Sequence, residues 1–410
     1  MPKEQIIASL DIGSSKIRTV IALLEEEKKM PNIIGVGVAP STGMRKGNVI
    51  DVDEAISNIS AALEDAERMS GAPIHHVFVG ISGQHIESFD SKGVIAISHA
   101  GSEIIEDDIN RVLEAAQAVN MPSNRRILRI IPKSFSIDDQ RNIKNPVGMI
   151  GVRLEVDAHI ITGQGTIIKN IEKAVHQAGV DIDDIVPASL VAAEAVLSRR
   201  QKELGVVVID IGAGSTSVSV FEEGTTLFTT SLPVGGESVT NDVAIGLRTS
   251  IDTAEKIKIE YGTTAPDEVS DRETIDLSII SKIDNQKVSK KHLAEIIQAR
   301  YHEIFVMAKD ELRSIGRDGM LPAGAILTGA GVKMPGCLDL AREVLGLPVQ
   351  IGFPTEVEGV VDKIDDPAYA TAIGLVVWGA KYEGRSYGFS GLDVKKFLGG
   401  VKGWFKNLLP

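Results

Sequence analysis

Cysteine, tryptophan and long apolar runs are scarce in this chain of 410 residues. The single cysteine, Cys337, cannot form an internal disulfide, and it leaves too few thiolates for a cysteine-based zinc site. The eight histidines are scattered without the spacing of metal ligands. The N-terminal segment carries charged residues where a signal peptide needs an apolar stretch, so we expect the protein to stay inside the cell.

Excess positive charge and membrane-spanning segments are also lacking. Lys and Arg number 43 against 56 Asp and Glu, and the formal net charge of −13 argues against nucleic acid as a partner, because a phosphate backbone requires clustered cations. The longest apolar run, 372–380, is far shorter than the roughly 20 residues that span a bilayer. With 43% hydrophobic and 24% charged residues, the composition predicts a soluble globular protein of several compact units.

Apolar periodicity predicts alternating strands and helices along most of the chain. A helix is expected over 53–69, with Asp51 or Asp53 as its N-cap and Gly71 at its end. Another is expected over 188–201, and a long helix with one apolar face over 290–315. The strand 206–211 is apolar throughout, which is typical of the centre of a sheet covered on both faces.

A strand–turn–strand pattern occurs twice. Residues 6–23 (IIASLDIGSSKIRTVIAL) and 206–221 (VVVIDIGAGSTSVSVF) each contain an apolar strand ending in Asp-Ile-Gly, a turn of small residues and a second alternating strand. Glycine turns let backbone N–H groups point into the bend, where they can bind phosphate oxygens. Two facing hairpins would clamp a polyphosphate from both sides. The alternative is that Asp-x-Gly is only turn chemistry between strands.

The equivalent aspartates of the two copies, Asp11 and Asp210, are candidate ligands for Mg²⁺ through its water shell, because this ion prefers a few carboxylates together with phosphate oxygens. A third glycine turn, 327–336 (LTGAGVKMPG), follows a predicted strand and could approach a flat base and its ribose closely. The chain has no complete Walker P-loop or G-x-G-x-x-G fingerprint, which excludes the usual nucleotide-binding classes that carry them.

These motifs resemble the actin, Hsp70 and sugar-kinase superfamily, whose two phosphate loops match 11–16 and 210–216 and whose adenosine loop matches 328–336. Longer segments resemble the FtsA family of bacterial cell-division proteins; they are 127–163, 200–214, 232–262 and 327–336. The resemblance covers nearly the whole chain. It implies an α/β, actin-like two-lobe fold, made of duplicated ribonuclease-H-like domains with two inserted α+β subdomains.

The resemblance also implies a division of the chain into subdomains. They are 1A (1–83, 163–200 and 365–382), 1C (84–162), 2A (201–236 and 309–364) and 2B (237–308), followed by a linker (383–391) and an amphipathic membrane-targeting helix (392–410).

ATP and Mg²⁺ are the ligands that the resemblance implies. The phosphate contacts would come from Gly13, Ser14, Ser15, Lys16, Gly212, Ala213, Gly214 and Ser215. The ribose and base contacts would come from Gly235, Gly236, Glu255, Lys258, Gly329, Ala330 and Gly331. Relatives that hydrolyse ATP often carry a residue that orients water near the start of the connecting helix. The nearest carboxylate here, Glu194, is out of register, so we expect at most a slow ATPase.

The last residues, 392–410, predict a helix with one apolar face and one basic face. The apolar positions are Val394, Phe397, Leu398, Val401, Trp404, Phe405, Leu408 and Leu409, and the basic ones are Lys395, Lys396, Lys402 and Lys406. Such a helix would bind anionic lipid. Three glycines in this segment each weaken a helix by roughly 1 kcal/mol, so it should form on the membrane rather than in water. The alternative is a helix that packs on the protein's own core.

The resemblance implies an ATP-binding, polymer-forming adaptor of cell division. Its partners would be FtsZ through the 2B region, later division proteins through 1C, further copies of itself, and the cytoplasmic face of the inner (plasma) membrane at the septum. The alternatives are an actin-like pilus-assembly protein, which would not be expected to carry the terminal helix, and a small-molecule kinase. An Hsp70-like motor is not expected, because too few residues follow Tyr382 for a peptide-binding domain.

Overall fold

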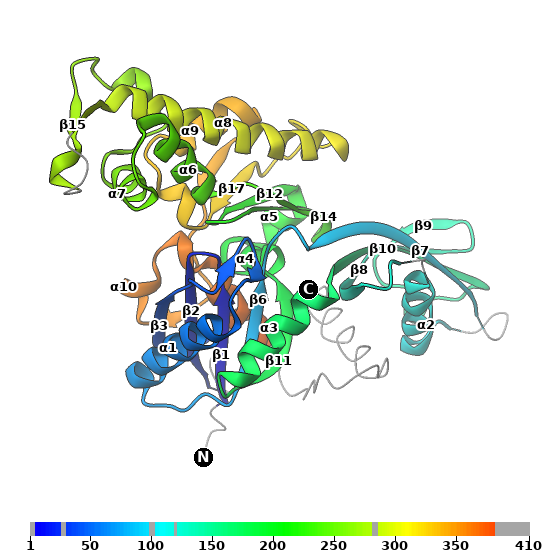
Figure 1. Ribbon diagram of the computed structural model, residues 1–410. Coiled ribbons are helices and arrows are strands. Elements are labelled where there is room, and N and C mark those ends of the chain that lie inside the picture. The colour runs from blue at the N-terminus through cyan, green and yellow to red at the C-terminus, as the bar shows by residue number, and fades with distance from the viewer. Residues whose placement is uncertain (1–4, 26–29, 98–102, 119–120, 281–285, 382–410) are drawn as a thin grey trace.

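The computed structural model describes residues 5–25, 30–97, 103–118, 121–280 and 286–381 (Figure 1). The predicted linker and terminal helix, 383–410, lie outside these residues, and so do all the predicted membrane contacts. Among the described helices, none is long and apolar enough to cross a bilayer.

The first lobe is built on a six-stranded sheet in the order β11-β6-β1-β2-β3-β19. Its strands are β1 (Gln5–Ile12), β2 (Lys16–Leu24), β3 (Asn32–Pro40), β6 (His76–Ile81), β11 (Asp181–Pro187) and β19 (Glu358–Gly359). Two hydrophobic clusters cover its faces: one includes α1 (Val52–Ser70) and α3 (Gly165–Gln177), the other α4 (Ala188–Val196) and α11 (Ala370–Lys381).

The second lobe repeats this topology. Its five-stranded sheet has the order β14-β13-β12-β17-β18. The strands are β12 (Val206–Ile211), β13 (Thr216–Glu222), β14 (Thr225–Leu232), β17 (Ala325–Thr328) and β18 (Val349–Ile351). In both sheets three antiparallel strands are followed by two parallel ones, and the repeated hairpins β1–β2 and β12–β13 occupy the same place. The predicted duplicated α/β fold is confirmed.

Two inserts extend from the lobes (Figure 1). The first contains β7 (Glu87–Ala96), α2 (Glu106–Gln117), β8 (Arg125–Ile137), β9 (Gln140–Ile143) and β10 (Arg153–Gln164), and it has its own core. The second contains α6 (Gly236–Leu247), α7 (Ile251–Tyr261), β15 (Thr274–Asp276), β16 (Lys287–Ser289) and α8 (Lys290–Ser314).

Two helix predictions are borne out and one is wrong. Asp51 accepts a hydrogen bond from the backbone N–H of Glu54, and Gly71 ends α1 with φ +71°. Helix α8 ends one residue before the predicted Ile315. The helix expected over 188–201 is instead broken into α4 and α5 (Arg199–Leu204), because Ser198 and Gln201 form a capping box that begins a new helix.

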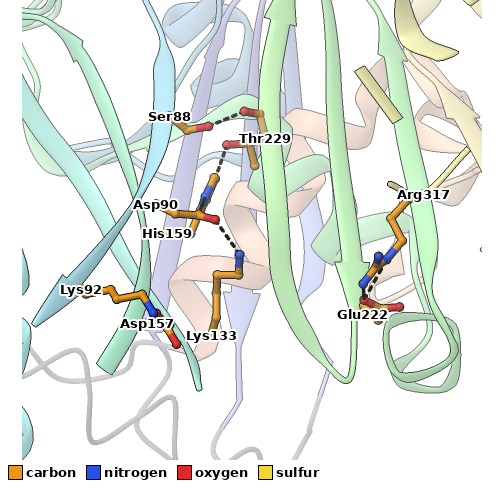
Figure 2. A network of polar contacts seen from close by, with 9 residues as sticks. All are labelled: Ser88, Asp90, Lys92, Lys133, Asp157, His159, Glu222, Thr229 and Arg317. Atoms are coloured by element: carbon orange, nitrogen blue, oxygen red, sulfur yellow. Dashed lines mark hydrogen bonds and ion pairs between the residues drawn. The ribbon is translucent and has the colours of Figure 1, made fainter. Parts of the chain in front are cut away.

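The first insert also contacts the second lobe, through strand β14 (Figure 2). His159 of β10, with 1% of its surface exposed, has Nε2 3.0 Å from Thr229 Oγ1 and Nδ1 2.9 Å from Asp90 Oδ1. Asp90 therefore keeps the ring proton on Nδ1, and Nε2 accepts from Thr229. Ser88 donates to the Thr229 carbonyl, and Lys133 Nζ lies 2.8 Å from Asp90 Oδ2. We call Ser88, Asp90, Lys133, His159 and Thr229 the interlobe network.

Candidate functional site

The two predicted phosphate loops face each other across the junction of the lobes. A Cβ added to Gly214 would lie 2.6 Å from Ser14 Oγ and 3.0 Å from Lys46 Cα, so a side chain here would force Ser14 to move. Gly212 N–H donates to Ser215 O at 3.0 Å and closes the second turn. Residues 11–16 and 210–216 thus meet at their tips. Ser14 and Gly13 are half-buried in the first loop, whereas Ser15 and Lys16 are exposed at its edge.

Asp11 and Asp210 lie at the ends of the central strands β1 and β12, one in each lobe. Burial raises the pKa of Asp11 to about 7, with Arg18 opposing this and Asp210 adding to it. Burial likewise raises the pKa of Asp210 to about 6, opposed by a hydrogen bond from Thr371 Oγ1 at 3.4 Å and by Arg18. Burial disfavours the ionised form of both carboxylates, and a cation bound beside them would stabilise that form.

Mg²⁺ fits this donor set. Among the described residues, no group of three or more His, Cys, Asp or Glu side chains could hold a metal by itself. A site of two carboxylates therefore needs water and phosphate oxygens to complete an octahedron, and that is the coordination Mg²⁺ accepts. The residues present suit a metal carried in with a nucleotide.

A glycine pair extends the second phosphate loop. Gly236 N–H donates to Gly212 O at 2.9 Å, and Glu237 N–H donates to Ala213 O at the same distance. A Cβ on Gly235 would lie 2.6 Å from Ala213 O, so this turn is pressed against the loop. The backbone at 235–236 is therefore held directly beside 212–213.

Lys258 and Glu255 contact each other at 2.6 Å on one face of α7. Lys258 is buried and also donates to Thr240 Oγ1 at 2.8 Å and to Gly236 O at 3.2 Å. Lys258 thus ties the pair to the glycine turn at 235–236, whereas the Glu255 side chain stays 45% exposed.

The third glycine turn packs on the end of β12. Gly329 has φ +86°, and a Cβ there would lie 2.2 Å from Asp210 Oδ1. A Cβ on Gly331 would lie 2.4 Å from Ile211 Cγ2, and Gly331 O accepts from Tyr301 Oη at 2.7 Å. Ala330, which lies between these two glycines in the chain, is the first residue of the short helix η3 (Ala330–Lys333). The turns at 212–215, 235–236 and 329–331 therefore converge on the carboxyl end of β12.

Glu194 is fully engaged by two lysines. Its carboxylate is bonded to Lys202 of α5 and to Lys381 at the end of α11. Although burial alone would raise its pKa, the two ammonium groups outweigh this and hold the pKa to about 2. A carboxylate bound in this way is poorly suited to orient an attacking water.

A small cavity of about 10 Å³, room for one water molecule, lies between the lobes beside the start of α4. Hydroxyl groups of Ser82, Ser189 and Ser217 contribute to its lining. The one carboxylate in that lining, Glu87, forms an ion pair with Arg125 at 3.0 Å. The cavity can hold water, but its lining offers no free general base.

Arg18 is a site residue that the sequence analysis missed. It pairs across the hairpin with Asp11, and its Nη1 lies 3.9 Å from Asp11 Oδ2. Its guanidinium also stacks 5.3 Å from the ring centroid of Tyr369. The hairpin register alone could have indicated it, because a short turn after Asp11 places a residue of β2 opposite that aspartate. Thr371, which comes from a distant helix, had no such signal.

Comparison with known proteins decides the family. A family model described as "Cell division protein FtsA" matches residues 207–374, and one described as "SHS2 domain inserted in FTSA" matches 83–162. The "Cell division protein FtsA" of Pseudomonas aeruginosa is 38% identical over 389 residues, which are 94% of this chain and 93% of that protein. The chain belongs to the FtsA family.

Solved structures show the fold of this FtsA-family chain. A chain of the "PilM-PilN type IV pilus biogenesis complex" has a TM-score of 0.66 at 16% identity, covering 91% of this chain and 98% of that one. MreB5 of Spiroplasma citri bound to ADP has a TM-score of 0.54 at 13% identity, covering 92% and 97%. The fold is actin-like, and this member of the FtsA family is a cell-division protein.

Proposed function

We propose that this FtsA-family chain binds ATP with Mg²⁺ between its lobes and, in that state, polymerises on the cytoplasmic face of the membrane to tether FtsZ at the division septum. One observation carries the nucleotide part: Ser14 and Gly214, from the two related hairpins, meet across the junction of the lobes. Each hairpin offers backbone N–H groups and hydroxyls of the kind that bind phosphate.

The roles of the residues follow from their positions. The turns at 13–16 and 212–215 contact the phosphates, and Asp11 and Asp210 hold Mg²⁺ through its water shell. The turns at 235–236 and 329–331, with Glu255 and Lys258, contact the ribose and base. Mg²⁺, when bound, would neutralise phosphate charge beside the two buried carboxylates. An actin-like relative of known structure, MreB5, is bound to ADP, which supports the same use of this fold.

Nucleotide acts here mainly as a conformational ligand. A ligand that contacts both lobes stabilises the closed arrangement by its differential affinity for it. Glu194 is engaged by lysines, and Glu87 is paired with Arg125. Hydrolysis is accordingly slow. The small-molecule kinase alternative lacks a free catalytic base in this cavity lining, and the pilus-assembly alternative is favoured less, because the family match is to cell-division proteins.

The terminal segment 392–410 supplies the membrane attachment. Its four lysines each contribute on the order of 1 kcal/mol near anionic lipid, and its apolar face adds burial at the acyl boundary. One such anchor binds weakly and reversibly. Copies arrayed in a filament bind by avidity, because each later anchor lands from an already attached polymer. FtsZ would dock on the 2B region and later division proteins on 1C.

Electron microscopy of the full chain on anionic lipid monolayers tests this proposal. Ordered filaments should appear with ATP and Mg²⁺ and should be absent when either is omitted. Filaments of equal order without nucleotide would reject its role in assembly. Filaments that form in solution but leave the lipid bare would reject the membrane role of 392–410.

A further inference from the structure

A short hairpin of the first lobe reaches the junction of the phosphate loops. Strands β4 (Met44–Arg45) and β5 (Asn48–Val49) pair in the register Met44 with Val49 and Arg45 with Asn48. The turn between them is Lys46-Gly47, with φ +49° and φ +79°. Two positive φ values identify the two-residue hairpin turn that normally takes Asn-Gly, so a lysine at its first position is strained.

This turn touches both phosphate loops. The backbone N–H of Gly47 donates to Ser14 Oγ at 3.2 Å, which leaves the hydroxyl proton of Ser14 free to donate to a ligand. The Cα of Lys46 lies 3.0 Å from where a Cβ on Gly214 would be. On its other side, a Cβ on Gly47 would lie 2.0 Å from Ser82 O. The turn is therefore held between Ser82, which follows β6, and the two loops.

The charges of Arg45 and Lys46 act across the junction on a carboxylate of the second lobe, Glu237. Glu237, in the first turn of α6 in the second lobe, has its pKa raised by burial, and Arg45 and Lys46 oppose this rise. Within the described parts of the chain, no carboxylate lies at ion-pairing distance from either cation. Arg45 is exposed and Lys46 half-buried, so both side chains remain available to an anion.

We propose that the turn Arg45-Lys46-Gly47 is a third phosphate-contacting element, which covers the terminal phosphate of the nucleotide where the two hairpins converge. The inference rests on the function proposed above and names a further part of the same site. The turn adds the positive charge of Arg45 and Lys46 at the point where the two loops meet. Ser14 links the turn to the first loop, so a ligand that engages one engages both.

Lys46→Asn is the most informative variant, because asparagine suits the positive φ at this position and removes the charge without straining the turn. Titration calorimetry of the full chain with Mg·ATP and Mg·ADP should show affinity for ATP falling about tenfold or more, the value of one charge-assisted hydrogen bond. Affinity for ADP should fall several times less. Lys46→Arg should retain most of the binding.

Lys92→Asn is the matched control. This exposed lysine of β7 pairs with Asp157 at 3.2 Å on the first insert, and its loss changes the net charge equally (Figure 2). Wild-type ATP affinity in Lys46→Asn, or equal losses for ATP and ADP, overturns the assignment to the terminal phosphate. Failure of the wild-type chain to bind ATP at all is a different result, which overturns the proposed nucleotide site itself.

Discussion

The hydroxyl oxygen of Ser14 lies 2.6 Å from the position that a Cβ on Gly214 would take, although the two residues belong to different lobes. The backbone of Gly214 has a negative or extended φ that alanine tolerates, so the obstacle to a side chain is space alone. The close contact of the two hairpins therefore depends on the absence of a side chain at Gly214.

Gly214→Ala should hold the hairpins apart and lower ATP affinity at least tenfold, because the phosphate contacts of the two loops could no longer be made together. Titration calorimetry measures this directly. The melting temperature should change little, since the loop can yield by separating the lobes. Unchanged affinity in a folded variant would show that the hairpins do not close on one ligand.

Asp210→Asn should weaken binding of ATP in the presence of Mg²⁺, while binding without the metal should change little. Asparagine keeps the shape and the contact with Thr371 but removes the charge that attracts the cation. The comparison is made by calorimetry with Mg²⁺ and with a chelator. Asp157→Asn, on the first insert, is the charge-matched control, and an equal effect of both substitutions would contradict a metal role for Asp210.

Much of this site could be predicted from the sequence, because the hairpins carry local signals. Asp-Ile-Gly after an apolar strand indicates the turn, and the repeat indicates the second lobe. The break at Ser198 could also have been predicted, since Ser-x-x-Gln is a capping signature. Contacts between distant segments had no such signal. Nothing in the sequence near Lys46 indicates that it approaches Gly214, and nothing near Thr229 indicates its contact with His159.

Glu194→Gln should destabilise the protein by about 3 kcal/mol, because it leaves Lys202 and Lys381 without their shared carboxylate. Affinity for ATP should be retained. Chemical denaturation gives the free energy of unfolding. Glu203→Gln, which breaks only an exposed pair with Arg199, should stay within about 0.5 kcal/mol of wild type. If Glu194→Gln kept full stability but lost ATPase activity, the result would favour a role for Glu194 in orienting the attacking water.

His159→Leu should loosen the first insert from strand β14, since Thr229 would lose a hydrogen-bond partner and Asp90 would keep only Lys133 (Figure 2). The expected loss of stability is about 1–3 kcal/mol. Hydrogen exchange should become faster in 225–232 and remain unchanged in α8, which lies in the other insert. Unaltered exchange in β14 would mean that the interlobe network does not hold the two parts together.

His85 should make stability depend on pH. Burial, with a smaller effect from Arg125, lowers its pKa from 6.5 to about 4 in the folded chain. Between these values the unfolded chain binds more protons, so this residue makes the free energy of unfolding fall as the pH is lowered from 6.5 towards 4, by up to about 1.4 kcal/mol per pH unit. The free energy of unfolding of wild type should therefore fall relative to that of His85→Gln as the pH is lowered from 7 towards 4, because glutamine does not titrate. A difference between the two that is constant across this range would contradict the buried, neutral state of His85.

Hydrogen–deuterium exchange of the full chain with and without Mg·ATP tests the central claim most directly. One triphosphate held between two related hairpins should slow exchange in 11–16 and 210–216 together, with the same dependence on nucleotide concentration. Protection of one hairpin alone, or of neither at saturating nucleotide, would contradict the account.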